Sequence, residues 1–125
     1  MNAMIPPDEL GKMGEEIAVA YLKKEGYKII TRNWHYGHKE IDIIARQGDE
    51  MVMVEVKTRE GNFFEEPWEA VSLRKIRNLV EVADAWLNLK QIDLETRFDV
   101  ISIVFSDDVQ YELTHFPGAF TPPVN

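Results

Sequence analysis

The segment Glu40–Thr58, EIDIIARQGDEMVMVEVKT, decides the fold expected for this chain. Its first part, Glu40–Arg46, alternates carboxylates with apolar residues, and Met51–Thr58 alternates methionines, a glutamate and a lysine with valines. Alternation with a period of two is typical of strands with one face on a core. A glycine-containing turn over 47–49 separates the two runs, which predicts an antiparallel pair of strands.

The length of the connecting turn determines which charged side chains meet. A two-residue or four-residue loop places Asp42 opposite Glu55. The same loops place Glu40 opposite Lys57. A three-residue loop would put Asp42 on the other face from Glu55 unless a bulge intervened. In the first register the four charged groups share one face, and a continuous apolar face is expected behind them, formed by Ile41, Ile43, Ala45, Val52, Val54 and Val56.

These four charged groups form a candidate catalytic site. Two carboxylates, Asp42 and Glu55, can hold a hard cation such as Mg²⁺ or Mn²⁺, and Lys57 can orient a water or stabilise negative charge during phosphodiester cleavage. Glu40 would be an auxiliary ligand or a partner for the lysine. The alternative is a half-exposed hairpin in which Glu40 and Lys57 form a surface ion pair. Against it, facing carboxylates repel each other unless a cation, a proton or the lysine compensates.

A first helix is expected between Asp8, a plausible N-cap, and Gly26, which suits the C-terminal cap. Small residues, including Gly11, lie on the same stripe of this helix as Glu15 and predict a close approach to the sheet. Glu15 would then help to bind the metal, directly or through water. A solvated helix position is the alternative for Glu15 and for Glu16, of which Glu15 is preferred.

The rest of the chain completes an α/β fold in the order α-β-β-β-α-β-β. Its expected elements are a strand over 27–33, a polar aromatic loop over 34–39, a long amphipathic helix entered through Pro67, and a closing hairpin of 97–105 and 109–116. We expect one domain over residues 1–125, with a core spanning about 8–120.

Other polar residues have weaker interpretations. His35 and His38 fit an exposed loop better than a metal site. Arg97 and Asp99 share a strand face, which favours an internal ion pair over a catalytic role. The candidates for contacts with nucleic-acid phosphates are basic residues, for which a solvated surface is the alternative: Arg59, Arg74, Lys75 and Arg77.

Composition limits the functions available to this chain. It has 125 residues, 45% of them hydrophobic, a net charge of -8 and no cysteine, which excludes disulfides, Cys-ligated zinc, iron-sulfur clusters and thiol nucleophiles. No secretion signal or membrane span is evident, so a cytoplasmic protein is expected. The acidic balance disfavours a simple basic-patch binder. Most of the excess acidity follows residue 80, however, so weak, salt-sensitive and metal-dependent DNA binding is expected.

Several motifs in order resemble the YraN-like family of bacterial proteins, from about Gly11 to Phe120. They are Gly11-x-x-Gly14-Glu15, Glu40–Ala45, Val54–Arg59, Glu69-Ala70-Val71 with Lys75, Arg97–Val100 and Ala119-Phe120. The resemblance implies a restriction-endonuclease-like fold, with a mixed central sheet flanked by helices, and kinship with archaeal Holliday junction resolvases and other PD-(D/E)xK nucleases. It also implies catalytic roles for Glu15, Asp42, Glu55 and Lys57. Lys39 departs from the family, which usually has a glycine there.

Residues and resemblance together predict a Mg²⁺- or Mn²⁺-dependent endonuclease that acts on DNA, branched DNA included. The first alternative is a non-catalytic module of the same fold that binds nucleic acid or a protein partner. The second is an enzyme that acts on another phosphodiester, such as a nucleotide. A homodimer would suit the cutting of two strands, although the sequence identifies no interface.

Overall fold

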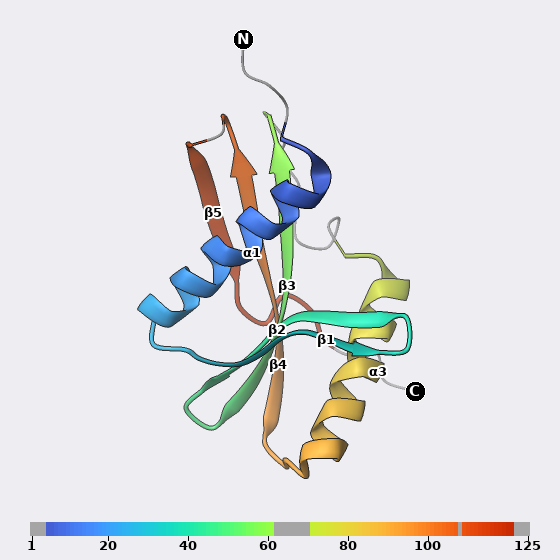
Figure 1. Cartoon of the computed structure of the whole chain (residues 1–125). Helices are drawn as coiled ribbons and strands as arrows, with labels where there is room; N and C mark the ends of the chain where they lie inside the picture. The colour runs from blue at the N-terminus through green and yellow to red at the C-terminus, as the bar shows by residue number, and fades with distance from the viewer. Residues whose placement is uncertain (1–4, 62–70, 108, 122–125) are drawn as a thin grey trace.

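The computed structural model describes residues 5–61, 71–107 and 109–121. Within them the chain forms a five-stranded mixed sheet flanked by two helices, in the predicted order α-β-β-β-α-β-β (Figure 1). The elements are α1 (Pro7–Lys24), β1 (Lys28–Tyr36), β2 (Lys39–Gln47), β3 (Glu50–Glu60), α3 (Leu73–Lys90), β4 (Glu95–Phe105) and β5 (Tyr111–Phe116). The strands lie in sequence order; β3 and β4 are parallel and the other neighbours are antiparallel. This confirms the predicted fold class.

The alternating residues of the central strands bury both faces of the sheet. One face packs against α1 through Ile43, Ala45, Val52, Val54, Ile101 and Ile103, which meet Ala18, Val19 and Leu22 of the helix. The other face packs against α3 through Ile44, Met51, Met53 and Val100, which meet Leu79, Val82, Ala83 and Trp86. A strand with both faces covered reads as an unbroken apolar run, as Met51–Val54 does.

The predicted register of the β2–β3 hairpin is confirmed. Gln47 pairs with Glu50 across the two-residue loop, in which Gly48 has a φ of +58°, and pairing continues to Ile43 opposite Val54. Primed turns of this length require positive φ, which glycine adopts without strain. The ladder ends at that last pair, so neither of the two expected cross-strand pairs beyond it, Asp42 with Glu55 and Glu40 with Lys57, is formed.

Beyond Ile43 the second strand leaves β3 and continues with β1 alone (Figure 1). Ile41 packs in the cluster around α3, whereas Ile43 packs in the cluster around α1. The predicted continuous apolar face is therefore wrong for Ile41, because the strand turns a corner at Asp42. Asn33, with a φ of +51°, lies on β1 at the same corner.

Helix α1 begins one residue before the predicted cap. Pro6 is its N-cap and Pro7 its first residue, where a missing N–H does not matter, and Asp8 lies in the first turn. The predicted end is confirmed: Gly26 has a φ of +90°, and the Tyr27 amide donates to the Leu22 carbonyl at 2.9 Å. The positive φ at the position after the cap is typical of helix ends.

Two other expected boundaries differ. Residues 34–39 are not a loop, because β1 and β2 form a hairpin that turns at Gly37, whose φ is +64°. Pro67 lies outside the described residues, and α3 begins at Leu73 after Ser72, whose hydroxyl accepts from the Lys75 amide at 3.1 Å. The closing hairpin of β4 and β5 is confirmed.

Neither described helix has the length and apolar character needed to cross a membrane.

Gly14 is the glycine that lets α1 approach the sheet. A Cβ added there would lie 2.0 Å from the Thr58 Oγ1, whereas one added at Gly11 would meet nothing within 4 Å. We expect Gly14→Ala to destabilise the protein by about 1–3 kcal/mol through overpacking, measured by urea unfolding. The matched change Gly11→Ala should be neutral or stabilise by up to about 1 kcal/mol. Equal effects of the two substitutions would contradict this packing.

Candidate active site

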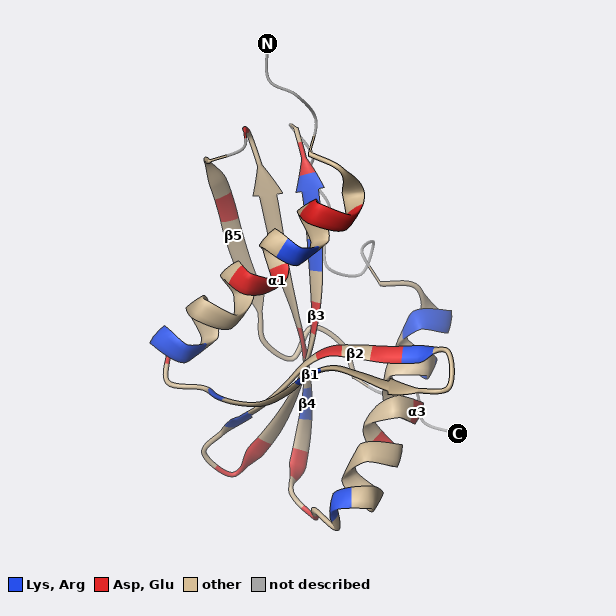
Figure 2. Ribbon diagram, in the orientation of Figure 1, with Lys and Arg blue, Asp and Glu red and all other residues tan. Residues whose placement is uncertain are grey.

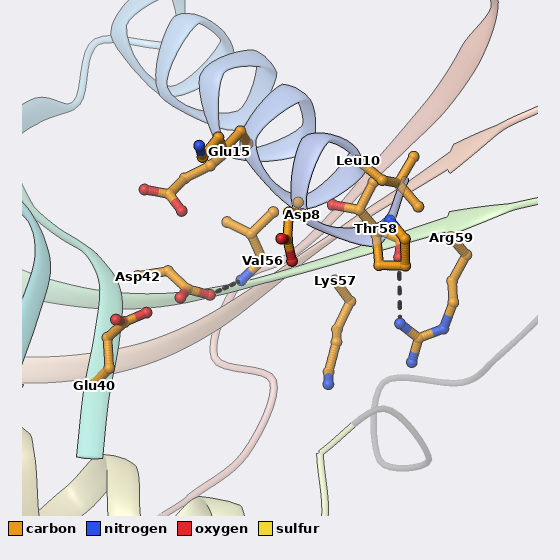
Figure 3. Close-up of a pocket in the computed structure, with 12 residues that line it drawn as sticks. Asp8, Leu10, Glu15, Glu40, Asp42, Val56, Lys57, Thr58 and Arg59 are labelled. Atoms are coloured by element: carbon orange, nitrogen blue, oxygen red, sulfur yellow. Dashed lines mark hydrogen bonds between the residues drawn. The ribbon is translucent and has the colours of Figure 1, made fainter. Parts of the chain in front are cut away.

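The candidate site lies at the fork where β2 separates from β3. The Asp42 Oδ2 accepts a hydrogen bond from the backbone amide of Val56 at 2.8 Å, so the carboxylate replaces the lost strand partner (Figure 3). An open groove of about 730 Å³ lies between this fork and the N-terminal half of α1. Its charged and polar lining consists of Asp8, Lys12, Glu15, Glu40, Asp42, Lys57, Thr58 and Arg59. Its volume is in the range of ligand-binding clefts.

Glu55 is buried next to Asp42, and its side chain is only 5% exposed. Burial raises the pKa of the Glu55 carboxyl to about 8, helped by the charge of Asp42 and by a hydrogen bond between the two carboxyl groups. Crowded carboxylates in a poorly solvated position favour the protonated form. The structure therefore brings together the two carboxyl groups on which the predicted site depends.

Lys75 also meets this carboxyl pair, although the sequence suggested that it contacts phosphate. Its ammonium lies 3.3 Å from the Glu55 carboxylate and lowers the pKa of that carboxyl, against the stronger effect of burial. The helix cap at Ser72 places Lys75 in the first turn of α3. Arg74 and Arg77, the other predicted contacts on this helix, are exposed. No local pattern in the sequence indicated the pairing, because it depends on how α3 docks.

Glu40 pairs with His35 across β1 and β2, rather than with Lys57. The His35 Nε2 lies 2.7 Å from the Glu40 carboxylate. Burial raises the pKa of Glu40, as do a hydrogen bond with Asp42 and its charge, whereas His35 lowers that pKa. Lys57 is one of the residues that line the groove, and in the described parts of the chain its side chain forms no hydrogen bond or ion pair. It extends from the side of β3 away from α1 (Figure 3).

Glu15 reaches the groove from α1, and in Figure 3 its carboxylate points toward the strands near Asp42. The Asn33 amide donates to the Glu15 Oε1 at 2.7 Å, and the Arg32 guanidinium lies 3.5 Å from the same oxygen. Glu16 is more exposed and binds Arg32 at 2.6 Å. Of the two glutamates, Glu15 is thus the one beside the candidate site.

The donor set suits a cation that needs few protein ligands. Among the described residues, no three His, Asp or Glu side chains gather closely enough to hold one metal ion. Mg²⁺ is commonly bound by one or two carboxylates and keeps several of its waters. The adjacent Asp42 and Glu55 carboxyls meet that requirement, and Glu15 lines the same groove as Asp42.

Comparison with known proteins identifies the family. The model of the uncharacterised protein family UPF0102 matches residues 14–103, most of the described chain. The chain belongs to UPF0102. A UPF0102 protein from Bacteroides thetaiotaomicron is 47% identical over 121 residues, covering 97% of this chain and 99% of the relative. One from Flavobacterium psychrophilum is 39% identical over 117 residues, covering 94% and 98%. The resemblance to the YraN-like family is thereby confirmed.

The UPF0102 chain contains a second buried charge network, away from the groove. Asp99 is 1% exposed and accepts from the Arg97 guanidinium at 2.8 and 2.9 Å, as the predicted internal ion pair requires. His115 adds an unpredicted partner, with its Nε2 at 2.7 Å from Asp99 and its Nδ1 at 2.9 Å from the Tyr21 hydroxyl. These contacts tie β4, β5 and α1 together behind the site.

The raised pKa of Glu55 makes the stability of this UPF0102 protein depend on pH. Between the ordinary 4.5 and about 8, the unfolded chain loses the Glu55 proton while the folded chain keeps it, so this group lowers stability as pH rises. We expect Glu55→Gln to stabilise the protein relative to wild type by about 3 kcal/mol at pH 8 and by much less at pH 5. Urea unfolding across that range measures the difference.

Glu112→Gln is the matched control, because Glu112 is exposed on β5. It should change stability by less than about 0.5 kcal/mol at every pH. A stability difference between wild type and Glu55→Gln that stays constant from pH 5 to 8 would contradict the assigned environment of Glu55.

Proposed function

We propose that this protein is a divalent-metal-dependent endonuclease that hydrolyses DNA phosphodiesters, with branched DNA such as a four-way junction among its substrates. The observation that carries the proposal is the closeness of the Asp42 carboxylate to the buried Glu55 carboxyl at the fork where the β2–β3 ladder ends. The cost of holding two carboxylates side by side is relieved by a bound cation. The groove beside this pair is open and also lined by Lys57.

Each residue has a distinct part in this proposal. Asp42 and Glu55 would hold the cation. Once bound there, the cation would polarise a phosphoryl oxygen and lower the pKa of a water molecule bound to it. Lys57 would orient the attacking water or stabilise charge on the phosphate; its ammonium forms no hydrogen bond or ion pair with the described residues and acts on Glu55 through its charge alone. Glu15 would act through water, and Glu40 would support Asp42.

Basic side chains of β3 and α3 are the proposed contacts with DNA. Figure 2 shows basic positions on the second half of β3 and at the start of α3. Arg59 lines the groove and bonds to the Thr58 carbonyl, and Arg74 and Arg77 are exposed. So few phosphate contacts, in a chain with a net charge of -8, favour weak binding; salt should weaken it further, with a slope set by the small number of phosphates contacted.

The direct test is cleavage of labelled duplex, single-stranded and four-way-junction DNA with Mg²⁺, with Mn²⁺ and with a chelator. Cleavage should require the metal. Lys57→Ala should reduce it strongly, whereas the matched change Lys28→Ala, at an exposed position of β1, should not. Metal-dependent cleavage that survives Lys57→Ala unchanged would remove this lysine from the proposed mechanism.

One observation favours a second candidate, a non-catalytic module of the same fold that binds nucleic acid or protein. The Lys75 ammonium lies 3.3 Å from the Glu55 carboxylate and partners it. In this alternative the carboxyl pair is a structural charge network, and neither Mg²⁺ nor Mn²⁺ would bind to it. Calorimetric titration with each metal separates the two candidates.

A further inference from the structure

Asn33 has an unusual backbone conformation for a residue inside a strand. Its φ is +51°, in the middle of β1. Among the described residues, Gln91 is the other non-glycine with positive φ, and it caps α3, where that conformation is common. Asparagine tolerates the left-handed region better than most residues, but the conformation still costs energy that the surrounding structure must compensate.

The position of Asn33 in the sheet connects it with the candidate site. Its two neighbours pair with Ile41 and Ile43 of β2, so Asn33 lies across from Asp42. Those isoleucines pack on opposite faces of the sheet, which marks this point as the corner of the β1–β2 hairpin. The left-handed residue therefore lies where the chain turns to bring Asp42 to the fork.

The side chain of Asn33 points to the glutamate of the groove. Its Nδ2 donates to the Glu15 Oε1 at 2.7 Å, and Arg32 approaches the same oxygen at 3.5 Å. In residues 5–61, 71–107 and 109–121, no side chain or backbone group bonds the other oxygen, Oε2. The Glu15 side chain is 15% exposed, so these donors hold a largely enclosed carboxylate.

We infer that Asn33 is a positioning residue of the site: its left-handed backbone forms the corner at Asp42, and its amide holds the Glu15 carboxylate in the groove with Oε2 left for water. This inference rests on the proposed metal-dependent function. Groups that orient metal ligands typically contribute tenfold or more to metal affinity. Neither the corner nor the contact follows from sequence periodicity.

Glycine separates the two roles, because Asn33→Gly keeps the left-handed conformation and removes the amide. We expect it to fold as wild type by circular dichroism and to weaken Mn²⁺ binding, measured by calorimetry, by about tenfold. Glu15→Ala should weaken Mn²⁺ binding to a similar degree, and the double variant should be no weaker than Glu15→Ala alone. Asn33→Ala, which removes the amide and strains the corner, should melt at a lower temperature than Asn33→Gly.

The outcomes distinguish this inference from the function on which it rests. Failure of the wild-type protein to bind Mn²⁺ would overturn the proposed function and this role with it. Wild-type binding with unchanged affinity in Asn33→Gly, or additive losses in the double variant, would overturn only the role of Asn33. Loss of the fold in Asn33→Gly would also overturn it, because the amide would then serve the fold and not Glu15.

Discussion

Asp42→Asn is expected to lower the rate of metal-dependent DNA cleavage by about a hundredfold or more, while the protein stays folded. The amide oxygen of asparagine can still accept from the Val56 amide, which Asp42 bonds at 2.8 Å, so the fork is kept. The variant also relieves the repulsion with the buried Glu55, and its stability should equal or exceed that of wild type. Cleavage rates and urea unfolding, measured together, test both parts.

Asp84→Asn is the matched control, since Asp84 is exposed on α3. It should cleave DNA at the wild-type rate. Because Asp42→Asn is isosteric and remains folded in this account, lost activity could not be attributed to misfolding. An Asp42→Asn variant that is folded and fully active would show that cleavage, if present, occurs at another site.

Asp99→Ala is expected to cause the largest loss of stability, about 3–5 kcal/mol, because it leaves the Arg97 guanidinium without its buried partner. The His115 ring and the Gly118 amide, which donates at 3.0 Å, also lose their acceptor. Natural domains are stable by only about 5–15 kcal/mol, so this single change approaches the whole margin. Urea unfolding at neutral pH measures it.

The Asp99 carboxylate also makes acid unfolding steeper. Burial alone would raise the pKa of the Asp99 carboxyl. That pKa is nevertheless lowered, because hydrogen bonds from His115 and Arg97 favour the charged form. A carboxylate with a lowered pKa stabilises the fold above its ordinary range, and that contribution is lost as pH falls. Asp93→Ala, at an exposed position, is the control. Equal free energies of unfolding for Asp99→Ala and Asp93→Ala would contradict the role assigned to Asp99.

Local pattern was enough to predict much of the fold. Strand alternation and the Gly48 turn predicted the β2–β3 register, and Gly26 predicted the end of α1, because each depends on neighbouring residues alone. The N-cap of α1 lies two residues before the predicted Asp8, at Pro6, since Pro7 serves as the first helical residue. Polar and aromatic residues over 34–39 predict a loop where the structure has a hairpin turn at Gly37, although a glycine between two apolar runs also fits a hairpin.

The remaining errors concern contacts between elements distant in sequence. The register predicts that the ladder continues through Asp42 with Glu55 to Glu40 with Lys57, but the corner at Asn33 ends it before both pairs. The stripe of small residues around Glu15, which includes Gly11, predicts the close approach of α1, but the tightest contact with the sheet is at Gly14, because the rotation of the helix decides which glycine faces Thr58. The partnership of Lys75 with Glu55 depends on helix docking, which periodicity does not specify.

The central claim is that Asp42 and Glu55 form a divalent-cation site, and calorimetric titration of the apo protein with Mn²⁺ tests it most directly. The account predicts one site per chain, with an affinity that rises between pH 6 and 8 as the Glu55 proton, whose pKa is about 8, becomes easier to displace. Asp42→Asn should remove the site, and Asp84→Asn should leave it intact. Absence of binding by the wild-type protein, or binding that Asp42→Asn leaves unchanged, would contradict the account.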